Sequence, residues 1–273
     1  MSTEIFVVTH KETQMPEEPC YTPLFVGAAG RTVPEGYRRD DTGDNISAKN
    51  DSYCELTGGY WLWMNTDAGI TGLVHYRRFF AHVRGFEYKS KHIVLSKKNA
   101  YRILSAAEAE KILAGCDILV KKSRTYKETN ETLFYRDFGA EIMDEARAVV
   151  QSQYPEYSSG FDRNLNMHYH VNCNMFIGHK EIADRYYDWL FDVLGRVDEA
   201  HKNRTGDRFH NRELGYLGEI LFGVWLDHNR INYRFYPVVC TSELDYTHPG
   251  RAEGCLVYPH ELIRLKFSRA KNG

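Results

Sequence analysis

The sequence predicts an α/β fold in which helices flank a mixed, mainly parallel central sheet of the Rossmann-like kind. Two short, mainly apolar runs, at residues 5–8 and 70–74, are typical of strands buried on both faces of a parallel sheet. Between them, residues 51–65 carry apolar side chains at helical spacing, so strand and helix alternate along the chain. We therefore expect an open sheet whose ligands bind where its parallel strands end.

The bulk composition narrows the class of protein. The chain has 273 residues, of which 42% are hydrophobic and 26% are charged, as in a globular protein with a sizeable core. No repeat, low-complexity tract or linker divides it, so we expect a single domain over residues 1–273. The net charge of −2 disfavours a nucleic-acid partner, which normally requires a basic excess.

The compartment is predicted from what the chain contains. None of the six cysteines forms a Cys-x-x-Cys motif, which indicates free thiols in a reducing environment. No apolar run reaches membrane-spanning length, and no signal peptide precedes the first strand. We expect a cytoplasmic protein, either free or at the inner face of the plasma membrane. The apolar and basic residues at 262–269 allow a docking helix or, at most, peripheral membrane contact.

The first strand, residues 4–9, ends in Thr9, followed by His10 and Lys11. Such residues are either a solvated loop or contacts to a nucleotide, and the sequence leaves both open. Residues 24–29 are predicted as a second strand. The polar loop at residues 37–47 has almost nothing to bury, which is typical of disorder or of ligand binding. Its unusual pattern, RDDTGDNIS, favours ligand binding through Arg38, Asp40, Asp41 and Asn45.

The predicted helix at residues 51–65 leads into the strand at 70–74. Ser52 and Glu55 have the spacing of a capping box, so we interpret Glu55 as a helix-capping residue rather than a catalytic one. The strand ends in His75, Tyr76, Arg77 and Arg78, at the edge where ligands are expected. Two adjacent guanidinium groups make a clamp for phosphate oxygens, so this tetrad is the centre of the predicted site.

The middle of the chain contributes further elements. Residues 82–100 are basic and lack a core face, which we interpret as a loop that moves over the site. Ser105 and Glu108 form a capping box that opens a helix ending near Gly115, and residues 116–120 are a strand. The cations that follow are either a solvated loop or contacts to phosphate or acceptor: Lys121, Lys122, Arg124 and Lys127.

The last third alternates again. A helix is predicted at residues 137–153, then a strand at 167–177 whose alternate positions share one face: His168, His170, Asn172 and Asn174. The His-x-His pair admits a metal site, although no carboxylate or third histidine lies nearby in the sequence. Helices at 180–200 and from Arg212 onward, and a strand at 231–239, complete the prediction.

These motifs together resemble a known family. The stretches VTHK, RDDTGDNIS, YCELT, GLVHYRRFF, NCNMFI and GYLGE are similar to those of small bacterial glycosyltransferases of capsular and exopolysaccharide biosynthesis, long filed as a domain of unknown function. The resemblance implies a GT-A-like fold, a UDP-sugar donor of galactose type (pyranose or furanose) and a glycan acceptor, either free or lipid-linked. Residues 1–120 would form the nucleotide-sugar-binding half and residues 121–273 the acceptor-side half.

The resemblance also suggests residue roles. In GT-A enzymes an Asn precedes a helix, as Asn50 does here, and the next strand ends in Asp-x-Asp, which holds a divalent metal. Here that strand ends in His75-Tyr76-Arg77-Arg78, so we expect arginines to neutralise the departing UDP and no cofactor to be required. A site for Mn²⁺ or Mg²⁺ would have to use Asp40, Asp41 and Asp44, on a different segment. Glu219 lies where inverting GT-A enzymes place a base; it is either that base or a charge favoured near a helix start, and Glu213 is the nearest rival.

The leading hypothesis is thus a glycosyltransferase that does not need a metal. Its predicted catalytic residues are Glu219, Arg77 and His75. Its predicted nucleotide-sugar contacts are Thr9, His10, Lys11, Arg38, Asp40, Asp41, Asn45, Asn50, Tyr76 and Arg78. His170, Asn172 and Asn174 would border the sugar or acceptor. Two alternatives stay open: a non-catalytic nucleotide-sugar or glycan-binding subunit of a polysaccharide assembly system, and a metal-dependent hydrolase using the RDDTGD aspartates with His168 and His170. The sequence does not determine the oligomeric state.

Overall fold

A computed structural model describes residues 2–83, 101–123 and 125–240, and these form a mixed, mainly parallel sheet flanked by helices. The main path of the sheet runs β3-β2-β1-β4-β8-β7-β9, in which β8 is antiparallel to both of its neighbours. The strands of this path are β1 (Thr3–Thr9), β2 (Tyr21–Phe25), β3 (Arg38–Arg39), β4 (Ile70–His75), β7 (Ile118–Lys122), β8 (Val171–His179) and β9 (Tyr233–Phe235). A branch leaves β4 through β5 (Arg78–Val83), which pairs with β6 (Tyr101–Ile103) and β10 (Val238–Cys240).

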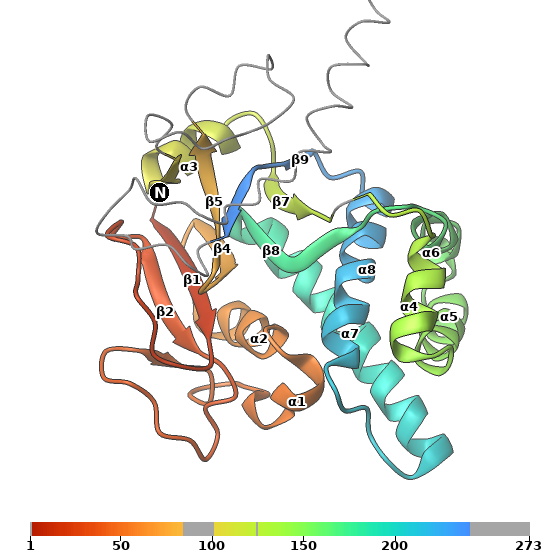
Figure 1. The fold of residues 1–273 in the computed structure, drawn as a ribbon. Coiled ribbons are helices and arrows are strands. Elements are labelled where there is room, and N and C mark those ends of the chain that lie inside the picture. The colour runs from red at the N-terminus through yellow and green to blue at the C-terminus, as the bar shows by residue number, and fades with distance from the viewer. Residues whose placement is uncertain (1, 84–100, 124, 241–273) are drawn as a thin grey trace, which may run out of the picture.

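Helices cover both faces of this sheet (Figure 1). One face packs against a large cluster drawn mainly from α2 (Leu56–Asn65), α5 (Glu141–Gln153), α6 (Ser158–Leu165), α7 (Lys180–Thr205) and α8 (Glu213–His228). The other face packs against α3 (Ala106–Leu113) and β5. The odd and even residues of β1 divide between the two faces, because Phe6 and Val8 join the first cluster whereas Ile5 and Val7 join the second.

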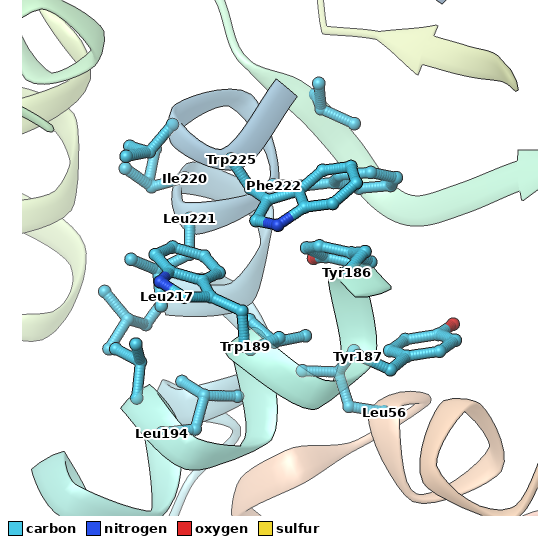
Figure 2. Close-up of a cluster of buried hydrophobic side chains, with 14 of the residues drawn as sticks. Leu56, Tyr186, Tyr187, Trp189, Leu194, Leu217, Ile220, Leu221, Phe222 and Trp225 are labelled. Atoms are coloured by element: carbon cyan, nitrogen blue, oxygen red, sulfur yellow. The ribbon is translucent and has the colours of Figure 1, made fainter. Parts of the chain in front are cut away.

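Aromatic side chains join α7 and α8 (Figure 2). Tyr186 stacks on Phe222 with ring centroids 4.1 Å apart. Leu56, the first residue of α2, is fully buried in the same cluster. The segment just before α2 is therefore anchored to the rigid part of the molecule, which matters for the site below. Within the described residues, no helix is both long and apolar enough to cross a membrane.

The structure confirms the predicted class and several elements. The helix opened by Ser105 has the full reciprocal capping box with Glu108 and becomes α3. The helices predicted at residues 180–200 and from Arg212 are α7 and α8, although α7 continues to Thr205. The predicted moving loop lies mostly outside the described residues, as does the tail at 262–269.

Other boundaries are wrong in ways that have a physical cause. The helix predicted at 51–65 is two helices, α1 (Asn50–Tyr53) and α2, because Cys54 adopts φ 52° and ends the first helix. The capping box predicted for Ser52 and Glu55 is absent, and Glu55 makes no side-chain cap at α2. The helix predicted at 137–153 is likewise divided at Gly139, with φ 81°, into α4 (Asn130–Phe138) and α5.

Strand predictions shifted by a few residues. The second strand, predicted at 24–29, is β2, which ends at Phe25. The strand predicted at 167–177 is β8, which starts at Val171, so His168 and His170 precede it. The last strand, predicted at 231–239, is divided into β9 and β10. Helix α6, preceded by a short 3-10 turn at Pro155–Tyr157, was not predicted at all.

Candidate active site

A cavity of about 580 Å³ opens at the carboxyl ends of β1 and β4. Val8 of β1 pairs with His75 of β4, and the Tyr76 N–H donates to the Val8 carbonyl, so the residues after both strands lie at one edge. The other walls come from the α1–α2 junction, the start of α8, and β8. The cavity thus lies where an open parallel sheet binds ligands, as the sequence predicted for the HYRR tetrad.

His75 is held as a neutral imidazole at the inner end of this cavity. Its Nε2 lies 2.7 Å from the Cys173 carbonyl oxygen, which can only accept, so Nε2 carries the proton. Burial, reinforced by the charge of Arg78, lowers the pKa of His75 to about 4. His75 therefore carries no charge at neutral pH and links β4 to β8.

Cations from several segments surround His10 at the mouth of the cavity. Arg77 lies over the Tyr76 ring, 4.8 Å from its centroid, and Lys11 lies over the same ring at 5.5 Å. Arg31 donates to the His10 carbonyl, which fixes it beside the end of β1. Partial burial and the charges of Lys11, Arg31, Arg77 and Arg212 together lower the pKa of His10. This concentration of positive charge is suited to an anion.

Arg212, just before α8, adds a further cation to this rim. It precedes α8 in the left-handed conformation, with φ 71°, and its N–H donates to the Asp51 carbonyl. Its side chain donates to the Cys54 sulfur at 3.3 Å and lies over the ring of Tyr216. These contacts tie the start of α8 to the α1–α2 junction, and Arg212 itself lines the cavity.

Glu219 lies on the inner wall, in a network of donors. Asn172 donates to its Oε2 at 2.8 Å, and Nε2 of His170 lies 3.3 Å from the same oxygen. Asn130 accepts from Nδ1 of His170, because its own amide nitrogen donates to two carbonyls. Burial alone would raise the pKa of Glu219, but the hydrogen bonds from His170 and Asn172 and the charge of Lys121 hold it below its ordinary value. Glu219 is therefore a buried carboxylate whose anionic form is stabilised by protein donors.

Glu55 is a second buried carboxylate in the same cavity. The Asn174 amide nitrogen donates to its Oε1 at 2.9 Å and also to the Gly215 carbonyl. Burial, with the nearby charge of Glu219 adding to it, raises the pKa of Glu55 to about 7. Two carboxylates that share a site but ionise at different pH values are typical of acid–base chemistry.

The predicted polar loop mainly builds its own structure. Asp40 is fully buried and accepts from the N–H groups of Gly27 and Ala28 and the hydroxyl groups of Ser47 and Thr57. Asp41 pairs with Arg39, Arg38 lies 3.9 Å from Glu4, and Asn45 bonds within the loop. These four predicted contacts, Arg38, Asp40, Asp41 and Asn45, are outside the described lining of the cavity, and their roles stay predictions.

The remaining predicted residues divide between wall and rim. Thr9, His10, Asn50, His75, Tyr76, Arg77, Arg78, Asn172 and Glu219 line the cavity. Asn50 fixes the α1–α2 junction by donating to the Cys54 carbonyl and the Thr57 hydroxyl. Lys11 borders the rim through Tyr76, whereas His170 and Asn174 support Glu219 and Glu55. His168 is exposed.

The residues present do not fit a divalent metal of the GT-A type. The end of β4 supplies cations, and the Nε2 atom of His75 is already bonded to a carbonyl. Across the described ranges, no group of three or more His, Cys, Asp and Glu residues is arranged to hold a metal. The loop aspartates and His170 bind different partners, so the constellation of the hydrolase hypothesis is not assembled by these contacts.

Two residues of the site were missed or misread from the sequence. Glu55 was interpreted as a helix cap because Ser52 precedes it by three positions. The interruption of the helix at Cys54 has no recognisable signal in the sequence. Arg212 carried no motif at all. The sequence signal that was available is composition: two glycines, Gly215 and Gly218, lie between Arg212 and Glu219 and permit close packing against the site.

Comparisons with known proteins identify a family and a similar fold. None of the curated proteins compared with the chain matches it. Among solved structures, the fold is similar to the apo structure of WbbM, a bifunctional glycosyltransferase, with a TM-score of 0.71 and 26% sequence identity. The match covers 89% of this chain but 46% of WbbM, so the chain spans about half the length of that protein. Residues 4–230 match the domain of unknown function DUF4422, and the chain therefore belongs to the DUF4422 family.

Proposed function

We propose that the protein is a glycosyltransferase that moves a sugar from a nucleotide-sugar donor to a glycan acceptor. The observation that carries this proposal is the division of one cavity: cations line its mouth at the ends of β1 and β4, and two carboxylates lie on its inner wall. A nucleotide sugar has a matching arrangement: its diphosphate is anionic, and the sugar reacts at the anomeric carbon bonded to that diphosphate. The similarity to a glycosyltransferase structure supports the same proposal.

The cations account for departure of the nucleotide. As the bond between the sugar and the diphosphate breaks, negative charge collects on the diphosphate oxygens. Arg77, after β4, and Arg212, just before α8, supply positive charge to that position without needing a metal. Neutral His75 adds no charge at the inner end, so the positive field stays concentrated at the mouth.

The carboxylates account for the other half of the reaction. The acceptor hydroxyl must lose a proton as it attacks the sugar, and Glu55 and Glu219 are buried carboxylates of the cavity that can take it. A hydroxyl-rich acceptor also suits the asparagines and histidine beside them. The sequence hypothesis gives this role to Glu219.

The finer identity of the substrates is also a proposal. Because of the family resemblance, we propose UDP as the nucleotide, a galactose-type sugar in pyranose or furanose form, and a capsular or exopolysaccharide acceptor that is free or lipid-linked. Such synthesis would place the protein in the cytoplasm, at or near the inner face of the plasma membrane.

The test is nucleotide release from a panel of UDP-sugars, each offered with a panel of alkyl glycosides as acceptors. We expect one pair to give acceptor-dependent release, and Arg77→Ala to lower kcat/KM by about 100-fold, as loss of one charge-stabilising group does in other enzymes. Lys202→Ala removes an exposed cation of α7 and is the matched control, expected to match the wild type. Nucleotide binding without transfer from any pair would contradict the proposal and favour a non-catalytic binding subunit, the alternative to which the missing Asp-x-Asp points.

A further inference from the structure

Backbone irregularities of separate elements meet at Glu55. Cys54, the residue before it, has φ 52° and ψ −128°, which breaks the helix and turns the next residue inward. Cys173 and Asn174 on β8 have φ 65° and 48°. A residue other than glycine rarely adopts positive φ, and such strain persists where the surrounding structure enforces it, commonly at functional sites. Nothing about helix capping requires these conformations.

The positive φ angles of Cys173 and Asn174 direct two side-chain amides of β8 to different carboxylates. Against β7, Val120 pairs with Phe176 and Lys122 with Val171, so β8 advances five residues while β7 advances two. This bulge contains both Asn172, which donates to Glu219, and Asn174, which donates to Glu55. The orientation of each amide is fixed, because Lys121 donates to the Asn172 oxygen and the Asn174 nitrogen also donates to the Gly215 carbonyl.

Helix α8 approaches this point through two glycines. A Cβ atom at Gly218 would lie 2.7 Å from Leu56 Cδ1 and 3.2 Å from the Asn174 side-chain oxygen. One at Gly215 would lie 3.2 Å from both the Cys54 Cβ and the Tyr53 carbonyl oxygen. Side chains at either position would push α8, and with it Glu219, away from Glu55. The two glycines therefore bring the two carboxylates into one cavity.

The two carboxylates have different surroundings. Glu219 receives Asn172 and His170 on one oxygen, with Lys121 nearby, and these donors stabilise its anionic form. Glu55 has one side-chain donor, Asn174, and the second polar atom of that amide, Oδ1, is buried without a partner among the described residues. A carboxylate rich in donors is a poor proton acceptor, whereas one with few donors is a good one.

We propose that Glu55 is the catalytic base of the transfer and that Glu219 is a fixed negative charge that stabilises the reacting sugar. This proposal rests on the proposed function. The acceptor oxygen forms a bond to the anomeric carbon while its proton passes to the Glu55 carboxylate. The bond from that carbon to the diphosphate oxygen breaks, and its electron pair leaves with the nucleoside diphosphate. Nothing is oxidised or reduced, and the positive charge that develops on the sugar is balanced by Glu219.

The electrostatics of the site are consistent with this division. Seven titratable or charged groups interact electrostatically with Glu55: Cys54, Cys173, Tyr186, Tyr187, Arg212, Tyr216 and Glu219. They come from the α1–α2 junction, β8, α7 and the start of α8. Burial raises the pKa values of both thiols, to about 11 for Cys54 and about 12 for Cys173, so neither competes as a base at neutral pH. A base that ionises near neutral pH is the most effective kind.

The experiment compares Glu55→Gln, Glu55→Ala and Glu219→Gln with Glu213→Gln, a glutamate at the start of α8 that accepts from the His210 N–H instead of lining the cavity. With the donor and acceptor found above, we expect Glu55→Gln to lower kcat by about 1,000-fold, within the range for a lost general base. UDP affinity by calorimetry should change less than about twofold, because glutamine keeps the size of Glu55 and its contact with Asn174 and leaves the cations of the rim in place. Glu213→Gln should match the wild type.

Two further readouts separate a base from a structural residue. The wild-type kcat/KM should rise with pH up to about 7, and Glu55→Gln should lose that rise. Formate should restore at least about tenfold of the lost rate in Glu55→Ala, whose missing side chain leaves room for a small carboxylate. Wild-type-like turnover in Glu55→Gln, or a rise with pH that persists in it, would overturn this inference while leaving the proposed function intact. A wild type that transfers nothing would overturn the proposed function itself.

Discussion

The replacement Glu55→Gln should change how stability depends on pH. Folding raises the pKa of Glu55 from 4.5 to about 7, mainly by burial. Between these values the folded protein keeps a proton that the unfolded chain releases, so the free energy of unfolding must fall as pH rises through this window. A shift of this size is worth about 3 kcal/mol between pH 4.5 and pH 8. Glutamine keeps the oxygen that accepts from Asn174 but cannot ionise, so the variant should lack this loss.

Urea unfolding at half-unit intervals from pH 4.5 to 8 measures the effect. The difference in unfolding free energy between variant and wild type should grow by about 3 kcal/mol in favour of the variant across the range. Glu181→Gln, which removes an exposed glutamate at the start of α7, is the control and should give a difference that hardly changes with pH. A pH-independent difference for Glu55→Gln would show that Glu55 ionises normally in the folded protein and would refute the reasoning.

Two other predictions concern residues that hold the site together. His75 should titrate near pH 4 rather than 6.5 by NMR of its ring protons, because burial and the charge of Arg78 lower its pKa. Its contribution to stability should therefore be lost as pH falls from about 6.5 to about 4. A normal titration would contradict the burial of this imidazole beside Arg78. Gly218→Ala should lower the unfolding free energy by about 1–3 kcal/mol through overpacking and should reduce transfer, because its Cβ would meet Leu56. Gly195→Ala, where a Cβ would meet nothing within 4 Å, should be neutral or stabilising. Equal effects at the two positions would contradict the close approach of α8 to the site.

The sequence predicted the edge of the sheet where the site lies. Short, mainly apolar runs identify β1 and β4 as buried strands, and parallel strands bring their carboxyl ends together, so Thr9, His10 and the tetrad from His75 to Arg78 were expected side by side. Glu219 was expected from the resemblance, because inverting GT-A enzymes place a base near the start of a late helix. These predictions depend on local patterns, which a single sequence displays directly.

The misread part of the site depends on backbone conformations that no local pattern shows. Cys54 and Cys173 adopt positive φ, which cysteine rarely does unless the surrounding structure enforces it. Asparagine adopts positive φ more readily, but Asn174 stands in a sequence pattern that predicts a regular strand. A regular helix would leave Glu55 as a cap, and a regular β8 would place Asn172 and Asn174 side by side instead of dividing them between two carboxylates. Helix α6 was missed because it is held mainly by tertiary contacts with α5 and α8, which a local sequence pattern does not show.

The central claim is that cations, and no metal, assist departure of the nucleotide from this cavity. The most direct measurement is acceptor-dependent UDP release from the UDP-sugar panel, with and without EDTA, for the wild type and Arg77→Ala. We predict release from one donor that survives EDTA and falls by about 100-fold in Arg77→Ala. Release that EDTA abolishes, or that Arg77→Ala leaves unchanged, would contradict the claim.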